Sequence, residues 1–102
     1  MGDYKLLIGG KLVDGDMTMD VVNPATGKPF ATVPRASKAQ ADAAIAAARA
    51  AVPGWSAVPF AERAAHLNRL ADAIAARKDE LARVLTMEQG KPLPEAQGEL
   101  AW

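Results

Sequence analysis

The chain has 102 residues, half of them apolar, and its twelve acidic side chains balance twelve lysines and arginines. This length fits one small domain, and a net charge of zero without a basic excess argues against nucleic acid as a partner. No apolar run approaches the ~20 residues that a membrane-spanning helix needs, so we expect no membrane partner and a cytoplasmic location.

Alanine dominates the apolar half of the chain, and only five residues are aromatic: two Trp, two Phe and one Tyr. An alanine side chain removes little apolar area from water, so each residue contributes little to a core. The composition therefore predicts a thin core that depends on partners for stability.

The first part of the chain is β-rich. Gly9-Gly10 is a good two-residue connection for a first hairpin. A second turn follows Asn23, where Pro24 presets φ and Gly27 can take the left-handed conformation. Pro29 and Pro34 cannot donate to a ladder, so this ribbon should lie at a sheet edge. The expected strands cover residues 4–8, 11–13, 18–22 and 30–33.

Helical periodicity begins at Ser37, which forms a capping box with Gln40. We expect Pro53-Gly54 to end this helix and Pro59 to open a second one. Its apolar stripe consists of Phe60, Ala64, Leu67, Leu70, Ala71 and Ile74.

A third helix should carry Asp79 and Glu80 in its first turn and end at Gly90. A fourth apolar stripe, made of Ala96, Leu100 and Trp102, is only two turns long. Because so short a stripe stabilises little, we expect the natural chain to continue beyond Trp102.

No catalytic or cofactor-binding residue can be assigned. The sequence has no cysteine and one histidine, His66, so neither a thiol nucleophile nor a triad or classical zinc site can be built. Gly90-Lys91 is not a phosphate loop, because Leu85 and Pro92 stand where glycine and Ser or Thr are required. No dinucleotide-binding glycine pattern occurs either.

Several motifs follow one another in the order typical of a known family. They resemble the amino-terminal segment of the NAD(P)-dependent aldehyde dehydrogenase superfamily, and the stretch Thr86–Leu93 is similar in sequence to its succinate-semialdehyde dehydrogenase branch. The matching motifs are Ile8-Gly9-Gly10-Lys11, Asn23-Pro24-Ala25-Thr26-Gly27, Ala31-Thr32-Val33-Pro34, Ala47-Ala48-Arg49-Ala50-Ala51, Trp55-Ser56, Glu62-Arg63, Leu70-Ala71-Asp72, Glu88-Gln89-Gly90-Lys91-Pro92, Glu95-Ala96 and Gly98-Glu99.

The resemblance implies an α/β parent fold, in which this segment supplies a β-hairpin region over 1–36 and three to four α-helices over 37–102. Together they would form the N-terminal part of a larger NAD(P)-binding domain, truncated at Trp102. The parent would use NAD or NADP to oxidise a small aldehyde, such as a semialdehyde, to a carboxylate through a cysteine thioester. Its partners would be the remainder of the enzyme and further copies in a homo-oligomer, and the segment alone would be inactive.

The resemblance also implies a structural Na⁺ or K⁺ site. Its ligands here would be the main-chain carbonyls of Val21 and Val22 and the carboxylate of Glu88, and oxygen ligands of this kind suit a hard cation. The alternative is that Glu88 forms an ordinary salt bridge or faces water.

Two other functions stay open from the residues alone. One is an autonomous helical interaction module without catalytic activity, which should unfold cooperatively as a defined oligomer. The other is an alanine-rich helical hairpin on a membrane surface, which the mixed charge of the helices disfavours.

Overall fold

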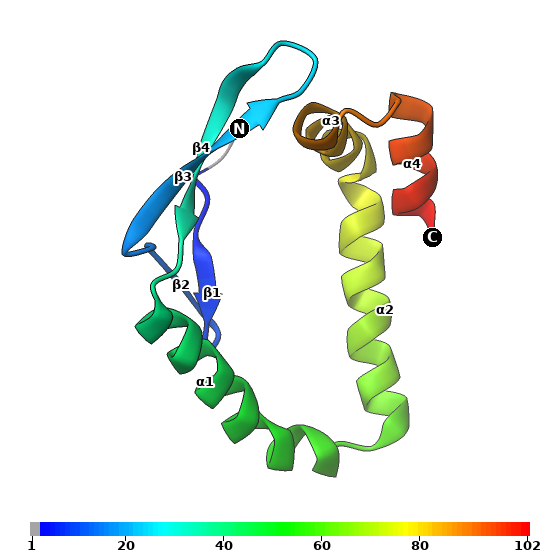
Figure 1. Cartoon of the computed structure of the whole chain (residues 1–102). Helices are drawn as coiled ribbons and strands as arrows, with labels where there is room; N and C mark the ends of the chain where they lie inside the picture. Colours follow the sequence, from blue (N-terminus) through cyan, green and yellow to red (C-terminus); the bar gives the residue numbers. More distant parts are fainter. Residues whose placement is uncertain (1–2) are drawn as a thin grey trace. The chain divides into compact units, whose positions relative to one another are not determined.

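The structure, a computed structural model, describes residues 3–102, which form two hairpins followed by four helices (Figure 1). This confirms the expected order of a β-hairpin region before three to four helices. No helix in this range is long and apolar enough to cross a membrane. The elements are β1 (Leu6–Ile8), β2 (Lys11–Val13), β3 (Met17–Asn23), β4 (Lys28–Arg35), α1 (Lys38–Ala57), α2 (Phe60–Ala76), α3 (Lys78–Gln89) and α4 (Leu93–Ala101).

The chain divides into two compact units. The first, the β–α1 unit, consists of Met1–Val21 and Ala31–Ala57. The second, the helical unit, consists of Val22–Phe30 and Val58–Trp102. The grouping of 1–36 and 37–102 as parts of one larger nucleotide-binding domain stays a prediction.

The first hairpin of the β–α1 unit forms as expected. Gly9 and Gly10 both have positive φ, 59° and 77°, which a tight two-residue hairpin turn requires. The antiparallel register pairs Leu6 with Val13. A Cβ on Gly9 would lie 3.7 Å from the Cβ of Ala47, so α1 packs closely on the end of this hairpin.

A polar clasp, made of Asp14, Asp16, Ser37 and Gln40, fastens the start of α1 to the turn between β2 and β3. The capping box is confirmed: Gln40 N–H donates to Ser37 Oγ at 3.3 Å, and Ser37 N–H donates to Gln40 Oε1 at 3.2 Å. The side-chain amide of Gln40 also reaches the turn: its oxygen accepts from Asp16 N–H at 2.9 Å and its nitrogen donates to the Asp14 carbonyl at 2.8 Å. Ser37 Oγ also donates to Asp16. One Gln side chain thus joins two elements.

Gly15 lies inside this turn and has no room for a side chain. A Cβ at this position would come within 2.8 Å of the Arg35 main-chain nitrogen and oxygen and of the Met17 carbonyl oxygen. These are backbone atoms, which cannot rotate away as a side chain could. The close approach of two main-chain segments therefore requires glycine here.

The expected end of the first helix at Pro53-Gly54 is wrong, because α1 continues through Pro53 to Ala57. Proline removes one intrahelical donor, but α1 has 20 residues and the remaining bonds carry it past this point. The helix ends at Ala57, two residues before Pro59. A residue that precedes proline disfavours the helical conformation, and Val58 is in that position.

The helical unit has its tightest packing between α3 and α4, which lie side by side (Figure 1). Ala82 on α3 and Ala96 on α4 have no exposed surface, and they are the buried apolar residues of the described chain. Both side chains are small, and small side chains allow packed helices to approach closely. The predicted end of α3 is confirmed at Gly90, whose φ of 81° is left-handed and whose N–H donates to the Thr86 carbonyl at 2.9 Å.

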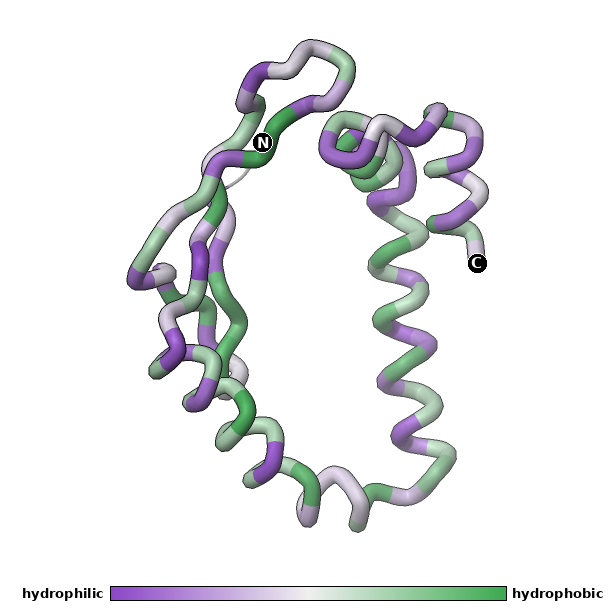
Figure 2. The backbone as a smooth tube through the Cα atoms, in the orientation of Figure 1, coloured by the Kyte–Doolittle hydropathy of each residue, from purple (hydrophilic) through white to green (hydrophobic). Residues whose placement is uncertain are grey.

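Larger apolar side chains stay at the surface. Along α2, apolar and polar residues alternate in bands (Figure 2), as its sequence periodicity predicts. Yet no residue of α2 is buried within this chain. The thin core expected from the composition is what the structure has.

Candidate functional site

The turn after β3 is fixed by its own hydrogen bonds. The side-chain oxygen of Asn23 accepts from Ala25 N–H at 2.9 Å, and its main-chain oxygen accepts from Gly27 N–H at 2.8 Å. Gly27 has a φ of 67°, as expected for the left-handed position of this turn. The Asn-Pro turn is therefore a rigid feature.

Within the helical unit this turn packs against the end of α3. A Cβ built on Gly90 would lie 3.0 Å from Cγ of Pro24 and 3.8 Å from its Cβ. Two features favour glycine at position 90: its backbone is left-handed, and the Pro24 ring leaves little room for a side chain. The contact brings the Asn-Pro turn close to Glu88, which lies two residues before Gly90.

The three residues of the expected cation site lie on β3 and α3. Val21 is half-buried and Val22 is exposed on β3, next to the Asn-Pro turn. Glu88 is exposed on the last turn of α3, and no described residue pairs with its carboxylate. Val22 and Glu88 belong to the helical unit and Val21 to the β–α1 unit. The site itself stays a prediction.

Among residues 3–102, no three His, Asp or Glu side chains lie close enough together to form such a site. Main-chain carbonyl oxygens are ligands that hard cations accept beside carboxylates.

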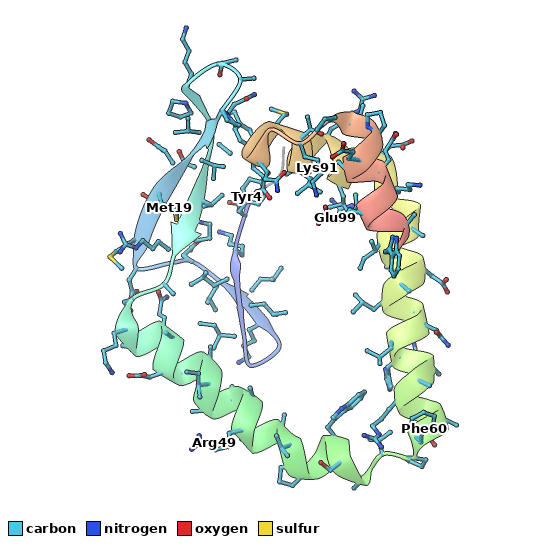
Figure 3. The ribbon with its side chains drawn as sticks, turned by 45° about the vertical axis from the view of Figure 1, so that its right-hand side comes forward. Tyr4, Met19, Arg49, Phe60, Lys91 and Glu99 are labelled. Carbon is cyan, nitrogen blue, oxygen red and sulfur yellow. The ribbon has the colours of Figure 1, made fainter. Side chains whose placement is uncertain are left out.

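The joint between α3 and α4 is held by polar bonds as well as by the alanine contact. Lys91 forms an ion pair with Glu99, and both are labelled beside this joint in Figure 3. Gln97 also donates a weak hydrogen bond to Asp79, at 3.5 Å. These contacts fix α4 on α3 close to Gly90.

The groups whose pKa values are shifted belong to exposed ion pairs. Two hydrogen bonds from Arg77, at 2.6 and 2.9 Å, lower the pKa of Glu80 below its usual value and raise the pKa of Arg77. Lys5 pairs with Asp14 at 2.5 Å and Asp3 at 3.1 Å, which raises the pKa of its ammonium group. Neither pair combines a nucleophile with a base, so we interpret both as structural.

Sequence reasoning missed two features of these sites. The second role of Gln40, bonding to Asp14 and Asp16, and the steric need for Gly15 both depend on segments that meet only after folding. The capping motif gave a partial signal for Gln40, and nothing in the local sequence marks Gly15 beyond a turn.

The order of elements and motifs can be compared with known proteins. The family model for the aldehyde dehydrogenase family matches residues 12–101. The chain belongs to the aldehyde dehydrogenase family. The resemblance inferred from the Asn-Pro turn and the Gly90 region is thereby confirmed.

The similar proteins include semialdehyde dehydrogenases. Glutarate-semialdehyde dehydrogenase of Pseudomonas putida is 45% identical over 97 residues, covering 93% of this chain and 20% of the relative. The NADP(+) succinate-semialdehyde dehydrogenase of Escherichia coli is 41% identical over 98 residues, covering 94% and 20%. This aldehyde dehydrogenase chain thus spans about a fifth of the length of those relatives.

Solved aldehyde dehydrogenases share its fold. A succinate-semialdehyde dehydrogenase from Burkholderia pseudomallei superposes with a TM-score of 0.90 at 46% identity, over 97% of this chain and 21% of that one. An NAD-dependent benzaldehyde dehydrogenase from Corynebacterium glutamicum gives 0.88 at 34% identity, over 98% and 22%. The arrangement of hairpins and helices is therefore that of the family.

Proposed function

We propose that this chain is the N-terminal scaffold segment of an NAD(P)⁺-dependent aldehyde dehydrogenase that oxidises a semialdehyde to a carboxylate. The match of residues 12–101 to the family supports the reaction class. Relatives named for glutarate and succinate semialdehydes support the substrate class. In this proposal a cysteine outside these residues would form the thioester with the substrate, a bound NAD(P)⁺ would supply the hydride acceptor, and water would hydrolyse the thioester to the carboxylate and the free thiol.

The segment contributes structure to this reaction. It has no cysteine, and its shifted titratable groups lie in exposed ion pairs. The isolated 102 residues are accordingly expected to be inactive, and the working enzyme is expected to be a homo-oligomer.

The reaction is tested with the longer polypeptide that contains this chain. Purified protein is given succinate semialdehyde or glutarate semialdehyde with NAD⁺ or NADP⁺, and reduced nucleotide is followed by its absorbance. We expect turnover of at least one pair, abolished when the single essential cysteine is replaced by alanine. Reduction of nucleotide by neither semialdehyde would contradict the substrate class, and turnover of benzaldehyde alone would move the enzyme to another branch.

We further infer that the Asn-Pro turn and the end of α3 hold a structural Na⁺ or K⁺. The carbonyls of Val21 and Val22 and the carboxylate of Glu88 would be its ligands. The contact of Pro24 with Gly90 and the unpaired, exposed carboxylate of Glu88 support this, since a cation would join the turn to the helix end.

Thermal unfolding of the longer polypeptide tests the cation site. Melting temperature is measured in K⁺ or Na⁺ and in choline at equal ionic strength, because an ion that binds only the folded state raises it by mass action. Glu88→Gln should remove the difference, whereas Glu95→Gln on α4 should keep it. Equal melting temperatures in choline and in the alkali ions would refute the site.

A further inference from the structure

The connection from β2 to β3 contains Asp14-Gly15, the one place in the chain where glycine directly follows an aspartate. The pair lies outside both strands (Figure 1). The main-chain nitrogen after an aspartate can attack Cγ of the aspartate side chain and close a cyclic succinimide. A side chain on the attacking residue hinders this approach, and glycine has none. Local chemistry therefore singles out Asp14 among the aspartates.

The carboxyl group of Asp14 is open to solvent. Its side chain is 85% exposed, so water can leave and enter freely. The partner of the carboxylate is Lys5, whose Nζ lies 2.5 Å away, and the pairing of Leu6 with Val13 places the two residues opposite each other. An exposed ion pair of this kind restrains a side chain only weakly. The carboxyl is thus accessible, with Lys5 as its one restraint.

The fold itself requires the labile pair. A Cβ at position 15 would come within 2.8 Å of the Arg35 main-chain nitrogen and oxygen, so a bulkier residue cannot replace Gly15 without a shift of the turn. The close backbone approach that positions this turn therefore keeps an unhindered nitrogen next to Asp14.

The other aspartates lack this combination, because each is followed by a residue with a side chain. On β3, Asp20 precedes Val21, whose branched side chain is the most hindering. Asp42 and Asp72 lie inside helices, where the next N–H belongs to the helical ladder. The remaining ones are Asp3, Asp16 and Asp79.

We propose that Asp14 is a site of spontaneous aspartyl isomerisation, which unfastens α1 from the β2–β3 turn. The Gly15 nitrogen bonds to Asp14 Cγ, and its proton leaves with the carboxyl oxygen as water. Water then adds to one of the two ring carbonyls. Opening at the main-chain carbonyl gives isoaspartate, in which the chain runs through Cβ and Cγ, and opening at the other restores aspartate. No oxidant, cofactor or substrate is needed, so the inference stands apart from the proposed function.

The product disturbs the polar clasp. In isoaspartate the former main-chain carbonyl of Asp14 becomes a free carboxylate, and the main chain gains one methylene group. That carbonyl accepts from the Gln40 side chain at 2.8 Å, while the same side chain accepts from Asp16 N–H and Ser37 N–H. Gly15 has no spare room beside Arg35 in which to absorb the longer chain. Isomerisation should therefore open the clasp at the start of α1.

The experiment ages the folded longer polypeptide at physiological temperature and neutral pH. Samples are digested with trypsin, and isoaspartate is located by electron-transfer fragmentation of the peptide 12–35, which contains Asp14, Asp16 and Asp20. We expect isoaspartate to accumulate with time at position 14 and not at the other two. Methyl transfer by an isoaspartyl methyltransferase gives an independent measure of the yield.

Two pairs of variants sharpen the assignment. Asp14→Glu keeps the charge but would need a larger ring, so methyl acceptance should be lost, whereas Asp20→Glu should leave it unchanged. Lys5→Met removes the restraint and should speed isomerisation about two- to fivefold. Lys11→Met removes the same charge at the Gly9-Gly10 end of the hairpin and should leave the rate unchanged. Circular dichroism checks that each variant is folded.

Hydrogen exchange tests the effect on the clasp. In the aged protein the N–H groups of Asp16 and Ser37 should exchange faster than in fresh protein, and that of Ala48, in the middle of α1, should not change. Unchanged exchange at Asp16 and Ser37 would overturn the unfastening of α1. Absence of isoaspartate at position 14 in the folded protein, equal yields at 14 and 16, or full methyl acceptance by Asp14→Glu would overturn the site.

Discussion

Different contacts stabilise the interior of each of the two compact units. In the β–α1 unit, the polar clasp and the close backbone approach at Gly15 fix α1 to the hairpins. In the helical unit, a fully buried alanine on each of α3 and α4, a left-handed glycine and the Lys91–Glu99 ion pair hold the joint between these helices. In both, the specific contacts lie at corners and joints. The larger apolar side chains, such as Leu67 and Leu70, are left on helix faces.

The difference indicates where each unit is sensitive to substitution. Directional hydrogen bonds and steric limits tolerate surface changes but not the loss of one partner or one added atom. A small apolar contact tolerates little polarity, because burying an unpaired charge is costly. A mutation at a joint should therefore cost far more than the same mutation on an outer face.

The largest expected effect is Ala96→Asp, in the helical unit. Ala96 has no exposed surface, so its aspartate would bury an unpaired charge between α3 and α4. We expect a loss of about 3 kcal/mol or more in the free energy of unfolding, measured with urea. The control Ala101→Asp lies in the same helix but is exposed, and should change stability by about 0.5 kcal/mol at most. Similar losses from both would mean that the α3–α4 contact is not the centre of this unit.

The second effect, Gly15→Ala, probes the β–α1 unit. Its methyl group would meet three backbone atoms at 2.8 Å, and the turn must shift to admit it. Overpacking of this kind costs about 1–3 kcal/mol. Gly54→Ala is the matched control, because Gly54 is helical and a Cβ there meets nothing within 4 Å. That change should stabilise the chain by about 0.5–1 kcal/mol, and destabilisation by it would show that Pro53 strains the helix.

The glycines also show how far sequence reasoning reaches. Gly27 could be assigned the left-handed position of its turn and Gly90 the end of α3, because the deciding motif stands beside each, and both have positive φ. Gly15 could be placed only in a turn. Its constraint comes from Arg35, twenty residues away, and such contacts follow from the folded backbone.

The same distinction between local and long-range information applies to the helix boundaries and to the cation ligands. The capping box at Ser37 and the end of α3 at Gly90 were predicted correctly, because the deciding residues are adjacent in sequence. The end of α1 was not, since Pro53 disfavours a helix locally while the bonds around it maintain one. The cation ligands came from family resemblance; the sequence alone does not show that Pro24 contacts Gly90.

A smaller effect is expected from Ser37→Ala, which opens part of the clasp. The change removes the hydroxyl that accepts from Gln40 N–H and donates to Asp16. Loss of a helix N-cap costs about 1 kcal/mol in unfolding free energy, measured by thermal melting followed by circular dichroism. Ser56→Ala, exposed near the other end of α1, should have almost no effect. If the two melts coincide, hydrogen bonds do not hold the β–α1 unit together.

The smallest effect is the pH dependence at the start of α3. Because hydrogen bonds from Arg77 lower the pKa of Glu80 in the folded state, the ionised carboxylate stabilises the folded chain. That contribution is complete above the unfolded pKa of about 4.3 and is lost as pH falls through the lower, folded value. The carbon-13 shift of the Glu80 carboxyl should therefore titrate below the usual range of a free glutamate. Arg77→Ala should return its midpoint to that range. An unchanged midpoint would mean that the first turn of α3 is stabilised by its own backbone and not by this ion pair.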